Sequence, residues 1–156
     1  MKKAGNKLLN VLAGFVAGGA AVGTIIKKRT DASNEALKKS QRLYMVFDQW
    51  LTFRQKGKSL EEYFIQNNYK TVAIYGMREL GEHLYDELKD SDITVKYVID
   101  KNADAVYIDV NVVTPDDYLE RVDVIVVTAV YYFEEIKEML GRKVDYAIVS
   151  LEDIIK

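Results

Sequence analysis

From residue 69 onward, short apolar runs alternate with segments whose apolar residues fall three or four positions apart. Runs rich in Val and Ile are typical of buried strands, and the wider spacing is typical of helices with one buried face. The predicted strands cover residues 71–75, 94–99, 106–108 or 112–113, 123–128 and 144–149. The predicted helices cover residues 78–89, 131–140, a brief stretch begun by Thr114-Pro115 and a last turn begun by Ser150. This alternation predicts an α/β domain with a five-stranded parallel sheet in the order 3-2-1-4-5.

The start of the chain has a different pattern. Residues 8–26 are nineteen consecutive uncharged residues, mostly aliphatic side chains, Gly and Ala, with three basic residues close to each end. A helix of this length spans a bilayer, so residues 1–29 are predicted to be a single-pass membrane anchor in contact with lipid. Small residues such as Gly14 and Gly18 stand four positions apart, a spacing that lets two helices approach closely in lipid and form a homo-oligomer. A Gly/Ala-rich anchor also produces such spacings by chance.

A cleaved signal peptide likewise combines a basic start with an apolar stretch. Two observations favour a retained anchor instead. The basic residues Lys27, Lys28 and Arg29 would have to cross the membrane in an exported chain, and basic flanks tend to stay in the cytoplasm. The domain that follows is also of a type whose ligands are usually cytoplasmic. We therefore expect it at the cytoplasmic face of the cell membrane.

Residues 30–68 are predicted to be a helical connector between the anchor and the α/β domain at residues 69–156. A helix is expected from about residue 34 to residue 56, capped by Asp31 or Ser33 and ended by Gly57. Its broad apolar stripe includes Phe47 and Trp50 and must be covered. We expect it to pack on the α/β domain; the alternatives are a second copy and the membrane interface. A second, short helix is expected after Ser59, where the spacing to a glutamate is that of a capping box.

Charge and composition restrict the chemistry. The formal net charge is -2, but residues 1–29 hold six basic and no acidic residues, which leaves the remaining chain with a net charge of -8. The acidic domain argues against a nucleic-acid partner, which requires a basic face. There is no Cys and a single His, His83, so no disulfide, thiol nucleophile or multi-histidine metal site is expected.

The first predicted strand runs into a turn that resembles a phosphate-binding loop. Gly76, Arg78 and Gly81 align with the three glycine positions of the G-x-G-x-x-G fingerprint, with Met77 between the first two. Arginine at the middle position obstructs the close approach of a pyrophosphate, but its planar guanidinium is suited to ligate a phosphate itself. The alternative is a solvent-facing arginine, with both glycines kept for the turn and for packing.

Further candidate ligand-binding residues follow the other strands. Asp100 ends the second strand, where an acid can accept hydrogen bonds from a ribose, and Lys101 is next to it. Asp100 is equally explained as a turn-forming residue. Thr128 and Tyr131 lie in the loop after the fourth strand. The expected ligand crevice is between this loop and the loop after the first strand. The ligands considered are a nucleotide, a nucleotide-sugar or NAD.

Several segments together resemble a known family. They are Tyr75-Gly76 through Gly81, Val98-Ile99-Asp100, Val112-Val113-Thr114-Pro115, residues 122–127 and residues 150–155. This set resembles the Rossmann-like nucleotide-binding module of bacterial polysaccharide-biosynthesis proteins, including the N-terminal parts of capsule nucleotide-sugar dehydratases and of sugar acyltransferases. The resemblance implies a module that binds a nucleotide-type ligand or docks beside a separate catalytic part.

Three functions are therefore considered. The first is a membrane-anchored module that binds a nucleotide, a nucleotide-sugar or a partner enzyme in surface-polysaccharide biosynthesis. The second is a structural adaptor that binds no ligand and oligomerises through its helices. The third is a small NAD-dependent sugar-nucleotide enzyme. The expected loops offer no general base, nucleophile or metal set, so no catalytic residue is assigned and a non-catalytic role is favoured.

Overall fold

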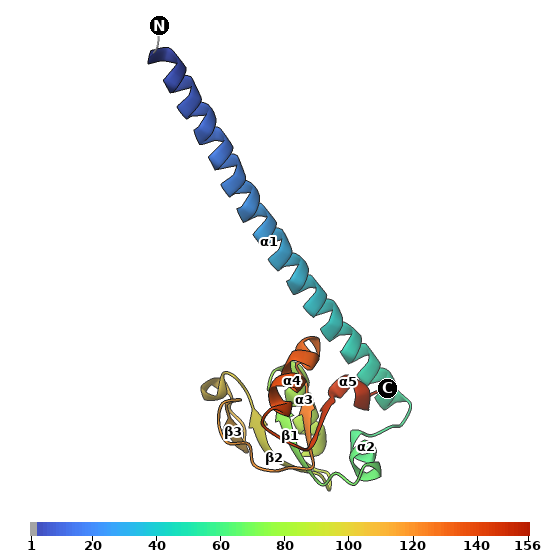
Figure 1. Ribbon diagram of the computed structural model, residues 1–156. Helices are drawn as coiled ribbons and strands as arrows, with labels where there is room; N and C mark the ends of the chain where they lie inside the picture. The colour runs from blue at the N-terminus through green and yellow to red at the C-terminus, as the bar shows by residue number, and fades with distance from the viewer. Residues whose placement is uncertain (1–2) are drawn as a thin grey trace. The chain divides into compact units, whose positions relative to one another are not determined.

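A computed structural model describes the chain from residue 3 to residue 156, and its side chains from residue 27 onward (Figure 1). The chain divides into two compact units, one ending at Gln41 and the other running from Arg42 to Lys156. Every strand, and every residue of the candidate site, belongs to the second unit.

The second unit is built on a five-stranded sheet. Its strands are β1 (Thr71–Tyr75), β2 (Thr94–Ile99), β3 (Asn111–Val113), β4 (Val124–Val127) and β5 (Ala147–Ser150). The order is β3-β2-β1-β4-β5 and every pairing is parallel, which confirms the predicted fold class and strand order. All four residues of β4 are buried, as expected for an apolar strand with a layer on each face. Of the two candidates for the third strand, the later one forms it.

Short helices precede, connect and follow the strands. They are α2 (Leu60–Gln66), α3 (Glu79–Leu88), η1 (Ala103–Ala105), η2 (Val130–Tyr132), α4 (Phe133–Gly141) and α5 (Leu151–Ile154). Ser59 and Ser150 cap α2 and α5, each accepting a hydrogen bond from the backbone N–H two residues later. The prediction of a brief helix after Thr114-Pro115 is wrong, because these residues form a turn. Asp117 Oδ2 instead accepts hydrogen bonds from the N–H and hydroxyl of Thr114, which closes a tight turn in its place.

Apolar layers cover both faces of the sheet, because successive strand residues point to opposite sides. Val72 and Ile74 of β1 contribute to a layer with α2, α3, α5 and the last turns of α1 (Lys3–Gln55). Ala73 and Tyr75 contribute to the opposite layer, which contains Ile136 and Leu140 of α4. The carboxyl ends of the strands therefore lie between two packed layers.

Helix α1 has no break at the predicted start near residue 34. Between residues 27 and 55 the sequence has neither Gly nor Pro, so nothing forces the helix to stop and restart, and the predicted caps at Asp31 and Ser33 are wrong. Its C-terminal part belongs to the second unit, where Val46 and Trp50 are buried in the core. The predicted packing of this helix on the α/β domain is confirmed.

Among the residues that the structure describes, no helix is both long and apolar enough to cross a membrane. The uncharged stretch of the predicted anchor is residues 8–26. The side chains of these residues lie outside the described part of the chain.

Candidate functional site

The turn after β1 is shaped by Gly76, whose φ of 92° is in the region that favours glycine. A Cβ at this position would lie 3.0 Å from Thr128 Oγ1, so the loop after β4 closes over the turn. The Thr128 hydroxyl lies 2.7 Å from the carbonyl oxygen of Gly76 and 3.0 Å from that of Tyr75, and donates its hydrogen bond there. Thr128 is buried and joins the two loops at the point where the strand order reverses.

Gly81 brings the first turn of α3 against the same loop. A Cβ at Gly81 would lie 2.1 Å from the carbonyl oxygen of Gly76, a distance that no side chain can occupy. This is the role of the last glycine of a dinucleotide fingerprint, which permits close packing of helix on strand. Close packing alone therefore explains why position 81 is a glycine, and no ligand is needed to explain it.

Asp100 connects the ends of β1 and β2. Its Oδ2 accepts a hydrogen bond from the backbone N–H of Met77 at 2.8 Å, and its Oδ1 accepts one from the N–H of Asn102 at 2.8 Å. Both carboxylate oxygens are thus engaged in holding two loops of the carboxyl edge. Each retains a lone pair, so a ribose contact stays a prediction, but the side chain already has a structural role.

Arg78 stands at the N-cap of α3, and no side chain caps the helix there. Its side chain is 87 % exposed, and its only ion pair among the described residues is a long contact of 3.9 Å with Glu79. Exposed pairs of this kind contribute little to stability. The guanidinium is therefore available to a ligand anion at a helix N-terminus, where the macrodipole also favours negative charge. Lys101 is exposed on the neighbouring loop.

Tyr75, the last residue of β1, was not among the predicted ligand-binding residues. It is 4 % exposed, and its hydroxyl has no hydrogen-bond partner among the described residues. Burial raises the pKa of this phenol, and the nearby carboxylates of Asp100 and Asp116 raise it further. The hydroxyl is therefore a neutral donor without an acceptor. The signal in the sequence was a tyrosine, with its polar hydroxyl, directly after the aliphatic residues Val72, Ala73 and Ile74 and before Gly76.

Tyr131 lies in a different feature, a groove of about 790 Å³ bounded by α1, η2, the start of α4 and α5. The structure thus brings Gly76, Met77, Gly81, Asp100 and Thr128 together through hydrogen bonds and close packing, whereas Tyr131 lines the groove. In the part of the chain that the structure describes, no group of three or more His, Cys, Asp or Glu residues is arranged to hold a metal ion.

Comparisons with protein-family models, with curated proteins and with solved structures found no match. The interpretation of the site therefore depends on its own geometry and chemistry.

Proposed function

We propose that this chain is a membrane-tethered, Rossmann-like module that binds a nucleotide or nucleotide-sugar at the carboxyl edge of its sheet. In this proposal the module acts in surface-polysaccharide biosynthesis, at the cytoplasmic face of the membrane. The pathway is proposed from the resemblance of the segments around Gly76, Asp100 and Thr114-Pro115 to modules of polysaccharide-biosynthesis proteins. The tether is residues 8–26, with Lys27, Lys28 and Arg29 as the flank that attracts anionic lipid.

One observation carries the ligand proposal. The strand order reverses between β1 and β4, and there the turn at Gly76 meets the loop of Thr128, with an exposed Arg78 at the uncapped start of α3. Ligands of open parallel sheets bind in the crevice at such a reversal. Amide groups at a helix N-terminus and a guanidinium together suit a phosphate.

The same residues favour a nucleotide or nucleotide-sugar over NAD. Arg78 occupies the position at which a glycine normally admits the pyrophosphate of a dinucleotide. Asp100, the counterpart of the ribose-binding acid, already accepts hydrogen bonds from Met77 and Asn102. A phosphate held by the Arg78 side chain requires neither a glycine at position 78 nor a free carboxylate.

The test is a thermal-shift panel of nucleotides, nucleotide-sugars and NAD on the full chain in detergent micelles. A ligand at a hundred times its Kd adds about 2.7 kcal/mol to the stability of the folded state and raises the melting temperature. Loss of a charge-assisted hydrogen bond in Arg78→Ala costs about 1.5–3 kcal/mol, which is about ten- to a hundredfold in Kd. The control is Arg121→Ala, because Arg121 is a similarly exposed arginine that precedes β4, at the amino edge. Equal binding by the wild type and Arg78→Ala would contradict the proposal.

A second candidate is the adaptor that binds no nucleotide. The side chains of Asp100 and Thr128 favour this candidate, because they already form hydrogen bonds with the backbone of the loops. Fewer polar groups at the carboxyl edge of the sheet are then left to bind a ligand. In this function the domain docks a partner, such as a polysaccharide-biosynthesis enzyme or a second copy. No response to any ligand in the panel, from a folded protein, would favour this candidate.

A further inference from the structure

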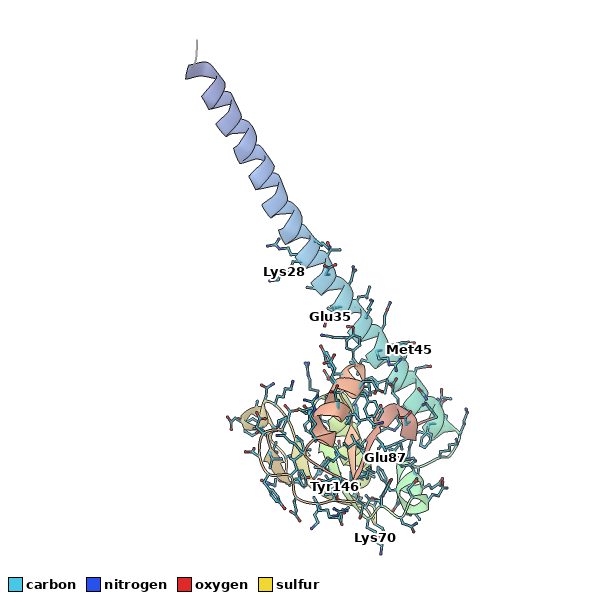
Figure 2. The ribbon with its side chains drawn as sticks, viewed as in Figure 1. Lys28, Glu35, Met45, Lys70, Glu87 and Tyr146 are labelled. Atoms are coloured by element: carbon cyan, nitrogen blue, oxygen red, sulfur yellow. The ribbon has the colours of Figure 1, made fainter. Side chains whose placement is uncertain are left out.

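A groove of about 790 Å³ lies near the carboxyl ends of β4 and β5, and it is lined by residues 42–49 of α1, by η2, by the start of α4 and by α5. Apolar side chains on its walls are exposed: Tyr44 and Met45 of α1 are 71 % and 59 % exposed, and Tyr131 and Tyr132 of η2 are 40 % and 37 % exposed. Met45 is labelled on α1 in Figure 2. Exposed apolar groups gathered in a concave surface together with polar groups are typical of interaction sites.

Acidic side chains also line this groove. Its carboxylates are Asp48, Glu134, Glu135, Glu152 and Asp153. The two basic residues that line it, Arg42 and Lys156, are each paired with one of them: Arg42 Nη2 lies 2.7 Å from Glu152 Oε2, and Lys156 contacts Asp153. Within residues 27–156, Asp48, Glu134 and Glu135 make no ion pair. The groove thus has three carboxylates without an ion-pair partner beside exposed apolar side chains.

Helix stability accounts for only part of this arrangement. Glu134 and Glu135 are in the first turn of α4, where acids complement the helix macrodipole. Asp48 lies in the interior of α1, where that reason does not apply, and the exposure of Tyr44 and Met45 has no such explanation either. The negative charge also repels phosphate, so the groove is unsuited to the nucleotide-type ligand proposed for the Gly76 turn.

We propose that this groove docks a basic, amphipathic segment of a partner protein. Charge complementarity identifies the occupant: Lys or Arg side chains of the partner lie opposite Asp48, Glu134 and Glu135, while its apolar side chains cover Tyr44 and Met45. The exposed ring of Tyr44 can also accept a cation of the partner on its face. This docking goes beyond the ligand proposal, and of the predicted ligand-binding residues only Tyr131 is shared with it, so either can fail without the other.

The test is selection from a displayed library of random short peptides on the full chain in detergent micelles. The enriched peptides are expected to combine Lys or Arg with apolar residues at helical spacing. A resynthesised peptide should bind about tenfold or more weakly to Asp48→Lys and to the double variant Glu134→Lys/Glu135→Lys. Its affinity should also fall as salt screens the charges. The control is Glu62→Lys, an exposed glutamate in the first turn of α2, which should bind as the wild type does.

Circular dichroism first establishes that each variant is folded, and the two charge reversals lie on different helices, so a defect in one leaves the other informative. The proposal is overturned if no peptide is enriched, if the enriched peptides lack basic residues, or if both charge reversals leave binding unchanged. It is also overturned if the enriched peptides match residues 27–42 of this chain and the chain self-associates, because the groove then belongs to a second copy.

Discussion

The indole Nε1 of Trp50 donates a hydrogen bond of 3.1 Å to Glu87 Oε2, and this contact joins α1 to α3. The other oxygen of Glu87 (labelled in Figure 2) accepts hydrogen bonds from Arg54 at 2.9 Å and from the backbone N–H of Leu60 at 3.2 Å. A single carboxylate therefore holds three segments: the end of α1, the start of α2 and α3. This cluster makes residues 42–55 of α1 part of the folded domain.

Removal of this carboxylate should weaken the domain. Glu87→Ala leaves the indole N–H and the Leu60 N–H without their acceptor, and an unsatisfied buried donor costs about 1–3 kcal/mol. We expect a loss of that size in the free energy of unfolding, measured by urea denaturation. Asp90→Ala, at an exposed acid just after the same helix, should change it by less than about 0.5 kcal/mol. Equal effects of the two changes would contradict the role of Glu87.

Two neighbouring positions on α1 test its packing. Trp50 is 6 % exposed, whereas Leu51 is 59 % exposed on the other side of the helix. Truncation of a buried aromatic residue to Ala typically costs about 3–5 kcal/mol. Trp50→Ala should therefore unfold the domain at much lower urea, while Leu51→Ala should have little effect. A Trp50→Ala protein as stable as the wild type would show that α1 does not pack on the domain in solution.

Two helical glycines provide a matched pair for the turn. A Cβ at Gly81 would collide with the carbonyl oxygen of Gly76 at 2.1 Å, whereas nothing lies within 4 Å of a Cβ at Gly141. Gly81→Ala should destabilise the domain by about 1–3 kcal/mol through overpacking. Gly141→Ala should be neutral or stabilising by up to about 1 kcal/mol, because Ala has the higher helix propensity. Thermal or urea unfolding of both variants measures the difference, and a tolerated Gly81→Ala would contradict the close contact.

Acid stability should depend on Asp123. Its Oδ2 accepts hydrogen bonds from the backbone N–H groups of Lys70 and Thr71 and from the Thr71 hydroxyl, and these lower the pKa of its carboxyl group in the folded state. The unfolded chain then binds the proton more readily, so the stabilisation is complete above the unfolded pKa of about 4 and is lost as the pH falls through the lower folded pKa.

In Asp123→Asn, the free energy of unfolding should therefore change less steeply with pH in the acidic range below about pH 5. Thr71→Val removes one donor and keeps both backbone donors, so its pH dependence should lie between those of the wild type and Asp123→Asn. The measurement is urea unfolding at a series of pH values. An unchanged slope in Asp123→Asn would contradict this assignment.

The sheet could be predicted from the sequence because its signal is local. β4 consists of β-branched residues and β1 is rich in them, and an apolar run of this kind between turn residues is typical of a buried strand. The predicted break in α1 failed because Asp31 and Ser33 are good caps that are also tolerated within a long helix. The helix expected at Thr114 failed because Asp117 folds back on the threonine.

The candidate site could be predicted only in part. That Gly76, Asp100 and Thr128 gather at one edge follows from the strand order, because parallel strands bring their carboxyl ends together. That the polar atoms of Asp100 and Thr128 are used inside the loops depends on contacts between segments far apart in sequence. The burial of the Tyr75 hydroxyl and the groove beside Tyr131 likewise arise only when the layers pack.

The central claim, a phosphate-bearing ligand at the turn after β1, is tested most directly by amide chemical shifts in two-dimensional NMR of the full chain in micelles. A nucleotide-sugar that stabilises the protein is titrated in, and the amides of Met77, Arg78 and Asp100 are followed with those of the groove. The account predicts saturable shifts clustered at residues 76–81, 100–101 and 128, and their loss in Arg78→Ala. Absence of shifts with every ligand of the panel, or shifts confined to other parts of the domain, would contradict it.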